Sequence, residues 1–234
     1  MLELLKLYME HISGGAYRLN KSFLLELLEQ NEGARVLDIG CADGEFSREI
    51  VNVTRGKVYG IDISPKYAER ASRNGINVVL GDVDRGLPFQ DESFDLVISN
   101  QVIEHVYSTD NFIKECYRIL KNGGTCIAST PNLASFHSII SLMLGYQPPV
   151  TAVSDELICG NPLDPWNERR FTLERRHRCV FTALALRRLF EFHGFEIETL
   201  KGFGLHPLPV ILSKYFKCTR YSLFLTIKAR KSGG

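Results

Sequence analysis

The fold is decided by the stretch Val36-Leu37-Asp38-Ile39-Gly40-Cys41-Ala42-Asp43-Gly44-Glu45-Phe46. A short apolar run leads into a turn of small residues, and a helical pattern follows the turn. This order is typical of a buried strand that ends at a helix start, where free backbone N–H groups point toward a ligand. A glycine turn without any ligand is the structural alternative. The stretch predicts a nucleotide-binding turn.

The sequence on both sides of this stretch alternates between short β-branched runs and longer helical patterns. Nearly continuous apolar runs are typical of strands that helices cover on both faces. The predicted strands are 35–39, 57–61, 77–80, 94–99, 125–129, 195–200 and 222–227. The predicted helices are 44–51, 65–74, 111–120 and 182–193. This alternation predicts an α/β fold with crossover helices.

The rest of the chain extends this core. Residues 1–30 have the pattern of two amphipathic helices separated by Ser13-Gly14-Gly15, and residues 228–234 are expected to be a frayed tail. About fifty residues after Pro131 have no regular pattern, which is typical of a binding loop or lid. We expect a single domain over 1–234. Its parts are N-terminal helices (1–30), a cofactor-binding core (33–130), a substrate or lid insertion (132–180) and a C-terminal helix with a strand hairpin (181–230).

Composition excludes several classes of protein. Lys and Arg total 28 against 27 Asp and Glu, so the basic excess of a non-specific nucleic-acid-binding protein is missing. Hydrophobic residues make up 44% and charged residues 24%, which excludes a mostly disordered or collagen-like chain. The six cysteines form no Cys-x-x-Cys pair. The first residues lack the pattern of a signal peptide, and the longest apolar segment, 133–144, is shorter than a membrane span. We therefore expect a cytoplasmic protein with no transmembrane span, and its oligomeric state stays open.

Acidic residues follow the second and third predicted strands. Asp62 comes directly after the second strand, and Asp82 follows the third. A carboxylate at the first position can accept both hydroxyls of a ribose, and one at the second can receive an adenine amino group. Ala42 and Glu45 occupy positions where the dinucleotide fingerprint Gly-x-Gly-x-x-Gly requires glycine. The pattern favours an adenosine ligand other than NAD or FAD.

With these motifs the chain resembles the class I S-adenosylmethionine-dependent methyltransferases, in the broad group that includes the ubiquinone-biosynthesis O-methyltransferases. Residues 38–44 match the Asp-x-Gly-x-Gly-x-Gly motif of that family, with Ala42 in place of the second glycine. The resemblance continues through Asp62, Gly81-Asp82, and the segments 94–106, 120–124, 129–132 and 181–195. It covers residues 33–130 and 178–200.

The resemblance implies a Rossmann-like, doubly wound, seven-stranded sheet. The sheet would be mostly parallel with an antiparallel last strand, and it would carry the helical N-terminal segment and a lid-like insertion after strand 5. The implied cofactor is S-adenosylmethionine, and S-adenosylhomocysteine is the product. Asp38 and Gly40 would line its methionine part, Asp62 its ribose and Asp82 its adenine. The other expected cofactor contacts are Cys41, Ala42, Gly44, Ile63, Val83 and Asn100.

The implied reaction is an in-line displacement. A nucleophile of the acceptor attacks the sulfonium methyl with inversion, and S-adenosylhomocysteine leaves. Because the sulfonium is already activated, alignment of the reacting atoms accounts for most of the acceleration. A base is needed only where the nucleophile arrives protonated.

Glu104 and His105 allow three interpretations. In the ubiquinone-pathway enzymes the corresponding segment resembles Glu-x-x-Glu-His and can bind a divalent cation, whereas here Gln101 replaces the first acid. Two ligands hold a hard cation poorly, so we expect no metal site. His105 is the first candidate for a general base, and a structural role for both residues is the alternative. Further acid–base candidates are His137, Tyr146, His177 and His206.

The acceptor and its accepting atom stay open. A small molecule is expected rather than a macromolecule, and the segments 136–144 and 203–209 predict an apolar pocket wall. An arginine cluster either clamps a phosphate or carboxylate or forms a solvated face; it comprises Arg169, Arg170, Arg175, Arg176 and Arg178. Three other functions stay open: a tRNA or rRNA methyltransferase, a non-catalytic S-adenosylmethionine-binding protein and an NAD-linked oxidoreductase.

Overall fold

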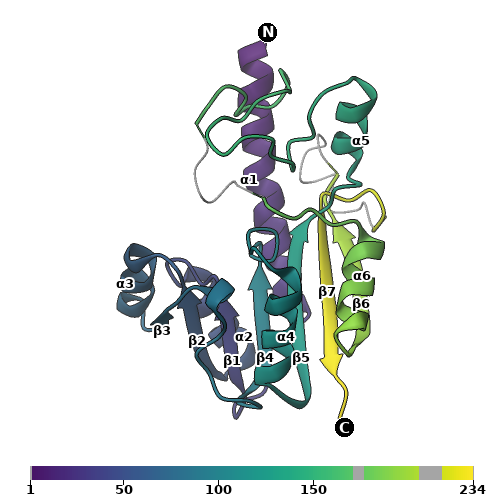
Figure 1. Ribbon diagram of the computed structural model, residues 1–234. Coiled ribbons are helices and arrows are strands. Elements are labelled where there is room, and N and C mark those ends of the chain that lie inside the picture. Colours follow the sequence, from purple (N-terminus) through teal and green to yellow (C-terminus); the bar gives the residue numbers. More distant parts are fainter. Residues whose placement is uncertain (1, 171–176, 206–217, 234) are drawn as a thin grey trace.

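A mixed sheet forms the centre of the computed structural model, which describes residues 2–170, 177–205 and 218–233, with side chains from residue 14 onward. Within this part, seven strands follow the order β3-β2-β1-β4-β5-β7-β6 (Figure 1). The strands are β1 (Arg35–Ile39), β2 (Lys57–Asp62), β3 (Asn77–Leu80), β4 (Phe94–Asn100), β5 (Leu120–Pro131), β6 (Phe195–Phe203) and β7 (Phe224–Lys231). Strands β1 to β5 pair in parallel, and β7 is antiparallel to both β5 and β6. The predicted doubly wound, mostly parallel sheet is confirmed.

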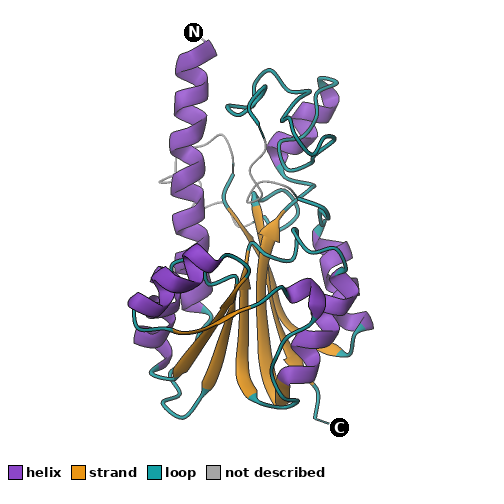
Figure 2. Ribbon diagram, turned by 60° about the vertical axis from the view of Figure 1, so that its left-hand side comes forward, coloured by secondary structure: helices purple, strands orange, loops and turns teal. Residues whose placement is uncertain are grey.

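Helices cover both faces of this sheet (Figure 2). The helices of the described residues are α1 (Leu2–Glu26), α2 (Glu45–Thr54), α3 (Pro65–Arg73), the 3-10 helix η1 (Val83–Arg85), α4 (Thr109–Ile119), α5 (Phe136–Met143) and α6 (Ala183–Phe192). Leu24 of α1 and Ile50 of α2 share a buried cluster with Val36 of β1 on one face. Phe112 of α4 and Phe190 of α6 belong to the larger cluster of the other face. Burial of apolar surface in these two clusters holds the layers together.

Serine and threonine side chains cap the starts of α3 and α6. The side chain of Ser64 accepts a hydrogen bond from the backbone N–H of Tyr67, and Pro65 occupies the first turn of α3. Thr182 caps α6 in the same way through Ala185. Serine and threonine at such positions satisfy backbone donors that the helix itself leaves unpaired. These caps fix where α3 and α6 start after their loops.

Helix α1 is continuous, so the predicted break at Ser13-Gly14-Gly15 is wrong. A glycine in a helix interior costs about 1 kcal/mol relative to alanine. Downstream of the glycines, Ala16, Asn20 and Leu24 lie four residues apart and are at most 4% exposed. Burial of this stripe against the sheet offsets the cost of the glycines, because packing rather than propensity stabilises most helices in proteins.

The C-terminal segment differs from the prediction as well. Residues 228–231 belong to β7 instead of a frayed tail, and Lys231 is 7% exposed. Its Nζ donates to the carbonyl oxygen of Leu120 at 2.8 Å, which anchors the strand end. The predicted irregular insertion contains α5. None of the helices in the described ranges combines the length and apolarity that a membrane crossing requires.

Candidate functional site

The turn after β1 lies against the segment that follows β4. Gly40 has a φ of +73°, a backbone conformation that glycine adopts without steric cost. A Cβ atom at Gly40 would lie 2.4 Å from Cγ2 of Val102, so no other residue fits there without movement of its neighbour. The backbone N–H of Gly40 donates to the carbonyl oxygen of Ile61 at 2.8 Å. The turn is therefore fixed between the ends of β2 and β4.

Backbone donors hold the Asp62 carboxylate at the end of β2. Its Oδ2 accepts a hydrogen bond from the N–H of Ala42 at 2.9 Å, and its Oδ1 accepts one from the N–H of Ser64 at 2.8 Å. A carboxylate has about four acceptor sites, so each oxygen keeps the capacity to accept another donor. The neighbouring Ile63 is 68% exposed. The carboxylate is thus oriented in advance beside an open apolar side chain.

Asp82 lies next to this end of β2. The N–H of Gly81 donates to the carbonyl oxygen of Asp62 at 3.0 Å, which brings the two strand ends together. The Asp82 side chain accepts a hydrogen bond from the N–H of Asp84 at 3.1 Å and starts η1. Val83 is half-buried against the larger core cluster. The structure therefore brings the two predicted adenosine acids to one edge of the sheet.

Asp38 and Cys41 point into the protein. Ser47 donates to Oδ2 of Asp38 at 2.6 Å, and burial raises the pKa of Asp38 to about 7. Cys41 is 3% exposed and packs closely over Gly60, and burial raises the pKa of its thiol to about 12. The Cys41 thiol therefore stays protonated at neutral pH, and a ligand contact at this position falls to its backbone.

A buried polar network joins α1 to the ends of β4 and β5. Nδ2 of Asn20 donates to Oδ1 of Asn100 at 2.8 Å, and Oδ1 of Asn20 accepts from the Ser129 hydroxyl at 2.9 Å. Nε2 of Gln101 donates to the same hydroxyl oxygen at 3.3 Å. The burial of Asn20 was not predicted, because a polar residue in an amphipathic helix gives no signal of burial.

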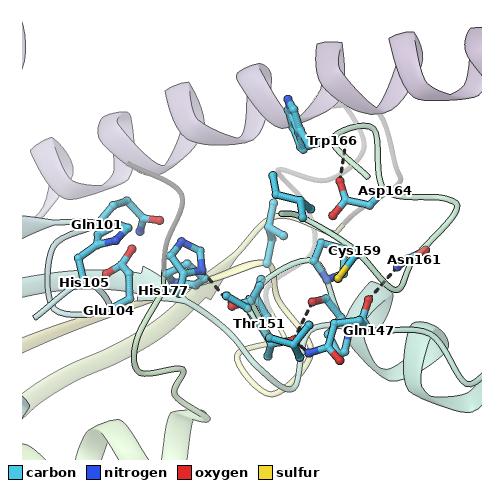
Figure 3. Close-up of a pocket in the computed structure, with 18 of the residues that line it drawn as sticks. Gln101, Glu104, His105, Gln147, Thr151, Cys159, Asn161, Asp164, Trp166 and His177 are labelled. Carbon is cyan, nitrogen blue, oxygen red and sulfur yellow. Dashed lines mark hydrogen bonds between the residues drawn. The ribbon is translucent and has the colours of Figure 1, made fainter. Parts of the chain in front are cut away.

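A cavity of about 510 Å³ lies beyond the end of β4, between α1 and the insertion (Figure 3). Pro131, Val150 and Phe224 contribute to its apolar wall. Its described lining comprises Gly14, Tyr17, Gln101, Glu104, His105, Pro131, Gln147, Pro148, Pro149, Val150, Thr151, Ala152, Val153, Leu157, Ile158, Cys159, Asn161, Asp164, Trp166, His177, Leu223 and Phe224. A volume of this size is typical of small-molecule sites.

Glu104, His105 and His177 meet at one end of this cavity (Figure 3). The Glu104 side chain is fully buried, and neither of its oxygens has a hydrogen-bond partner within the described part of the chain. Burial raises the pKa of Glu104 to about 8, against smaller lowering effects of its own backbone and of the Thr130 hydroxyl. The centroids of the two imidazole rings lie 5.1 Å apart. The structure thus joins two of the predicted acid–base candidates, His105 and His177, and adds a carboxyl group.

The other predicted acid–base residues do not meet there. His137 lies on α5 and Tyr146 follows it, and the described cavity lining includes neither side chain. His206 lies outside the described residues. The polar lining residues Gln147 and Asn161 were missed, because nothing in an irregular loop sequence indicates which side chains turn inward.

The members of the predicted arginine cluster do not share one environment in the structure. Arg175 and Arg176 lie outside the described residues, and Arg169 and Arg170 are exposed. The guanidinium carbon of Arg178 lies 3.5 Å from the centroid of the Tyr107 ring, a cation–π geometry. Arg178 is therefore engaged by an aromatic side chain of the post-β4 segment.

The sequence of this chain is similar to those of known methyltransferases. The family model described as "Methyltransferase domain" matches residues 9–200. A Mycolicibacterium smegmatis protein described as a probable S-adenosylmethionine-dependent methyltransferase is 29% identical over 188 residues, which are 80% of this chain and 61% of that protein. An Agrobacterium fabrum ubiquinone biosynthesis O-methyltransferase is 35% identical over 106 residues, 43% of this chain and 42% of that protein. The chain thus spans less than two thirds of the length of these relatives.

Solved structures share the fold. A methyltransferase from Thermotoga maritima superposes with a TM-score of 0.65 at 24% identity, covering 99% of this chain and 100% of that one. A methyltransferase chain from Haloferax volcanii, solved with the Trm112 methyltransferase activator, superposes with a TM-score of 0.63 at 16% identity. The match covers 99% of this chain and 98% of that one. Together with the match over residues 9–200, the sheet order and the turn after β1, this likeness makes the chain a member of the class I S-adenosylmethionine-dependent methyltransferase family.

Proposed function

We propose that this protein transfers a methyl group from S-adenosylmethionine to a small-molecule acceptor bound in the cavity. One observation carries this proposal: the glycine turn after β1 touches the segment whose next residues line the cavity. Gly40 packs against Val102, and Gln101, Glu104 and His105 line the cavity on either side of that contact. A cofactor on the turn and an acceptor in the cavity would therefore share one wall.

The residues at the turn fit the cofactor of this family. The pre-oriented Asp62 carboxylate suits the two hydroxyls of a ribose, and the exposed Ile63 offers an apolar surface for a base. Asp82 lies at the next strand end, where an exocyclic amino group would be within its reach. When bound, S-adenosylmethionine supplies a methyl group that its positive sulfonium already activates. These side chains would bind and orient the cofactor. We propose cofactor contacts for Asp38, Gly44, Val83 and Asn100 as well.

The lining of the cavity supports a small, partly apolar acceptor. Val150, Leu157 and Phe224 form apolar surface, while Thr151 and Asn161 place hydroxyl and amide groups among them. A few polar groups in an apolar pocket fix the orientation of a ligand. A nucleophile that arrives protonated would lose its proton at the Glu104 end of the cavity, where His105 and His177 lie.

Two measurements test the proposed function. Calorimetry with S-adenosylmethionine and, separately, NAD identifies the cofactor, and mass spectrometry of S-adenosylhomocysteine after incubation with acceptor mixtures identifies turnover. We expect binding of S-adenosylmethionine alone and product with at least one small acceptor. NAD binding without S-adenosylmethionine binding would overturn the cofactor assignment. Turnover with RNA but with no small molecule would overturn the acceptor class, and cofactor binding without turnover of any acceptor would favour a non-catalytic role.

A pair of leucine variants tests the acceptor cavity. Leu157 lines the cavity and is 40% exposed, whereas Leu163 is 37% exposed in the same insertion and does not belong to the described lining. Leu157→Trp narrows the cavity, so we expect a raised KM for the acceptor and unchanged affinity for S-adenosylmethionine. Leu163→Trp adds the same ring elsewhere and should change neither. Equal effects of the two variants would place the acceptor outside this cavity.

A further inference from the structure

We propose that Glu104, His105 and His177 bind one divalent cation of the zinc type. Each side chain offers a ligand atom, and these atoms all lie within 4.8 Å of one another. In the sequence, Gln101 stands in place of an acid, so only Glu104 and His105 were available as ligands. For that reason no metal site was expected. The structure brings in a third ligand from a distant part of the chain. The proposal concerns cation binding alone and does not depend on the proposed methyl transfer.

The backbone fixes the distant histidine against the other two ligands. The N–H groups of Arg178 and Cys179 donate to the carbonyl oxygen of Glu104 at 2.7 Å and 3.1 Å. These bonds tie the residues that follow His177 to the backbone of Glu104, which is itself one of the two sequence-adjacent ligands. The imidazole rings of His105 and His177 are inclined by 61° to each other, so they approach the same space from different directions. The ligand cluster is therefore built by the fold and not by one flexible loop.

The hydrogen bond of His177 orients its ring for metal binding. Its Nδ1 lies 2.9 Å from the carbonyl oxygen of Val150, which can only accept a hydrogen bond. In the neutral ring Nδ1 therefore carries the proton, and Nε2 carries the lone pair. Metal-binding histidines typically donate their second N–H to a carbonyl or a carboxylate, which fixes the tautomer and the ring orientation. His177 already has this outer hydrogen bond.

The burial of Glu104 indicates that a positive charge belongs beside it. Its side chain is fully buried, and both oxygens lack a hydrogen-bond partner among the described residues. Buried polar groups are nearly always hydrogen-bonded, and a buried carboxyl group that is ionised requires a partner of opposite charge or a metal ion. A divalent cation held with His105 and His177 would supply that charge. The unpartnered oxygens are thus an observation of their own, separate from the clustering of the ligand atoms.

The donor set selects the kind of cation. Two imidazole nitrogens and one carboxylate suit zinc and related transition metals, whereas magnesium and calcium prefer oxygen ligands throughout. Three protein ligands leave an open coordination position, as in catalytic zinc sites. All three ligands line the cavity, so the open position faces the space proposed for the acceptor. An acceptor with an oxygen, nitrogen or sulfur nucleophile could occupy it.

Zinc titration of the metal-free full chain tests this proposal. Chelator-treated protein is dialysed against buffered Zn²⁺, and bound metal is counted by elemental analysis for the natural chain and for Glu104→Gln, His177→Ala and His177→Gln. His193→Ala is the matched control, because His193 also lies next to a carboxylate, Asp110 at 2.7 Å, on another part of the molecule. Cys159→Ser tests the thiol in the cavity lining. Thermal unfolding of each variant shows whether it is folded.

We expect one tightly bound zinc ion in the natural chain and in His193→Ala and Cys159→Ser. Loss of an outer hydrogen bond to a metal ligand weakens binding by about 10- to 100-fold, so removal of a ligand in folded Glu104→Gln or either His177 variant should weaken it at least as much. Co²⁺ in place of zinc should give the absorption of a nitrogen and oxygen site, without thiolate bands. Unchanged zinc affinity in the folded His177 variants, loss of zinc in Cys159→Ser, or no stoichiometric zinc in the natural chain would overturn the proposal.

Discussion

Oδ2 of Asp62 accepts a hydrogen bond from the backbone N–H of Ala42 at 2.9 Å, so the acid at the end of β2 holds the turn at the end of β1. Its second oxygen is held by Ser64 at 2.8 Å, and the carboxylate has little freedom to rotate. A ligand that binds to this carboxylate therefore meets a group whose orientation was fixed during folding. Pre-organisation of this kind lowers the entropic cost of binding.

Replacement of Asp62 by alanine should weaken S-adenosylmethionine binding by roughly 10- to 100-fold, because hydrogen bonds to a charged group contribute about 1.5–3 kcal/mol. Calorimetry measures the change. Asp95→Ala is a suitable control: this carboxylate also accepts a backbone N–H, from Arg35 at 2.9 Å, but it lies near the start of β4. Equal losses in both variants, or no loss in Asp62→Ala, would contradict the ribose assignment.

Replacement of Gly40 by alanine should destabilise the protein more than replacement of Gly123. Both glycines have nearly the same φ, +73° and +75°, so the backbone strain of an alanine is matched. A Cβ at Gly40 would lie 2.4 Å from Val102, whereas one at Gly123 would meet nothing within 4 Å. Overpacking adds about 1–3 kcal/mol to the loss in unfolding free energy.

Urea unfolding of the two glycine variants measures this difference. A further change, Val102→Ala in the Gly40→Ala background, removes the clashing methyl groups and should recover part of the loss. If the two single variants lose the same stability, the contact between the turn and the post-β4 segment is not a close one.

Replacement of Asp38 by asparagine should flatten the pH dependence of stability. Folding raises the pKa of Asp38 from 3.8 to about 7 through burial, against the lowering effects of Ser47 and Lys21, and the charge of Asp62 adds to the rise. The native state therefore binds more protons than the unfolded chain between these values, and the unfolding free energy falls as the pH rises through that interval. The full effect is on the order of 4 kcal/mol.

Urea unfolding at several values between pH 4 and 8 tests this expectation. The natural chain should lose stability across the interval, and Asp38→Asn should lose less. Parallel curves for the two proteins would mean that Asp38 is already charged in the native state at low pH.

Replacement of Asn20 by alanine should lower both stability and cofactor affinity. It removes the donor to the buried side-chain carbonyl of Asn100 and the acceptor of the Ser129 hydroxyl proton, which costs about 1–3 kcal/mol. Asn100 is also a proposed cofactor contact, so its loss of orientation should weaken S-adenosylmethionine binding. Ser22→Ala changes an exposed residue of the same helix and should leave stability and affinity unchanged. A loss of stability without a loss of affinity would separate the network from the cofactor.

Binding of an acceptor should change the intrinsic fluorescence of the protein. Trp166 is the single tryptophan of the sequence, and it lines the cavity. A ligand in the cavity alters the surroundings of its indole ring, whereas S-adenosylmethionine on the turn after β1 should have a smaller effect. Titration of the metal-free and cofactor-bound protein with candidate acceptors measures the change. An acceptor that is turned over without any change in fluorescence would argue for a binding place away from Trp166.

The positions of the proposed cofactor-binding residues in the fold were predictable because their signals are local. Apolar runs followed by small residues mark buried strands and their turns, and acids directly after Ile61 and Gly81 are placed at the sheet edge by the strands themselves. The mostly parallel seven-stranded sheet and its antiparallel last strand followed from the family resemblance and are confirmed.

The acceptor half was not predictable in the same way. The meeting of His105 with His177 depends on hydrogen bonds from Arg178 and Cys179 to Glu104, and no periodic pattern in an irregular segment indicates such bonds. The continuity of α1 was missed for a related reason. Local propensity at Gly14 and Gly15 favours a break, and only the packing of Ala16 and Leu24 in the folded chain opposes it.

The position of β7 has a consequence for the order in which the sheet is assembled. It follows β6 in the chain and yet lies between β5 and β6, to which it pairs on either side. While a ribosome is still making residues 224–231, β6 has no neighbouring strand, although β1 to β5 are already complete in sequence. The nascent chain therefore carries an unpaired strand edge until β7 emerges, and a chaperone that covers such an edge would act during this interval.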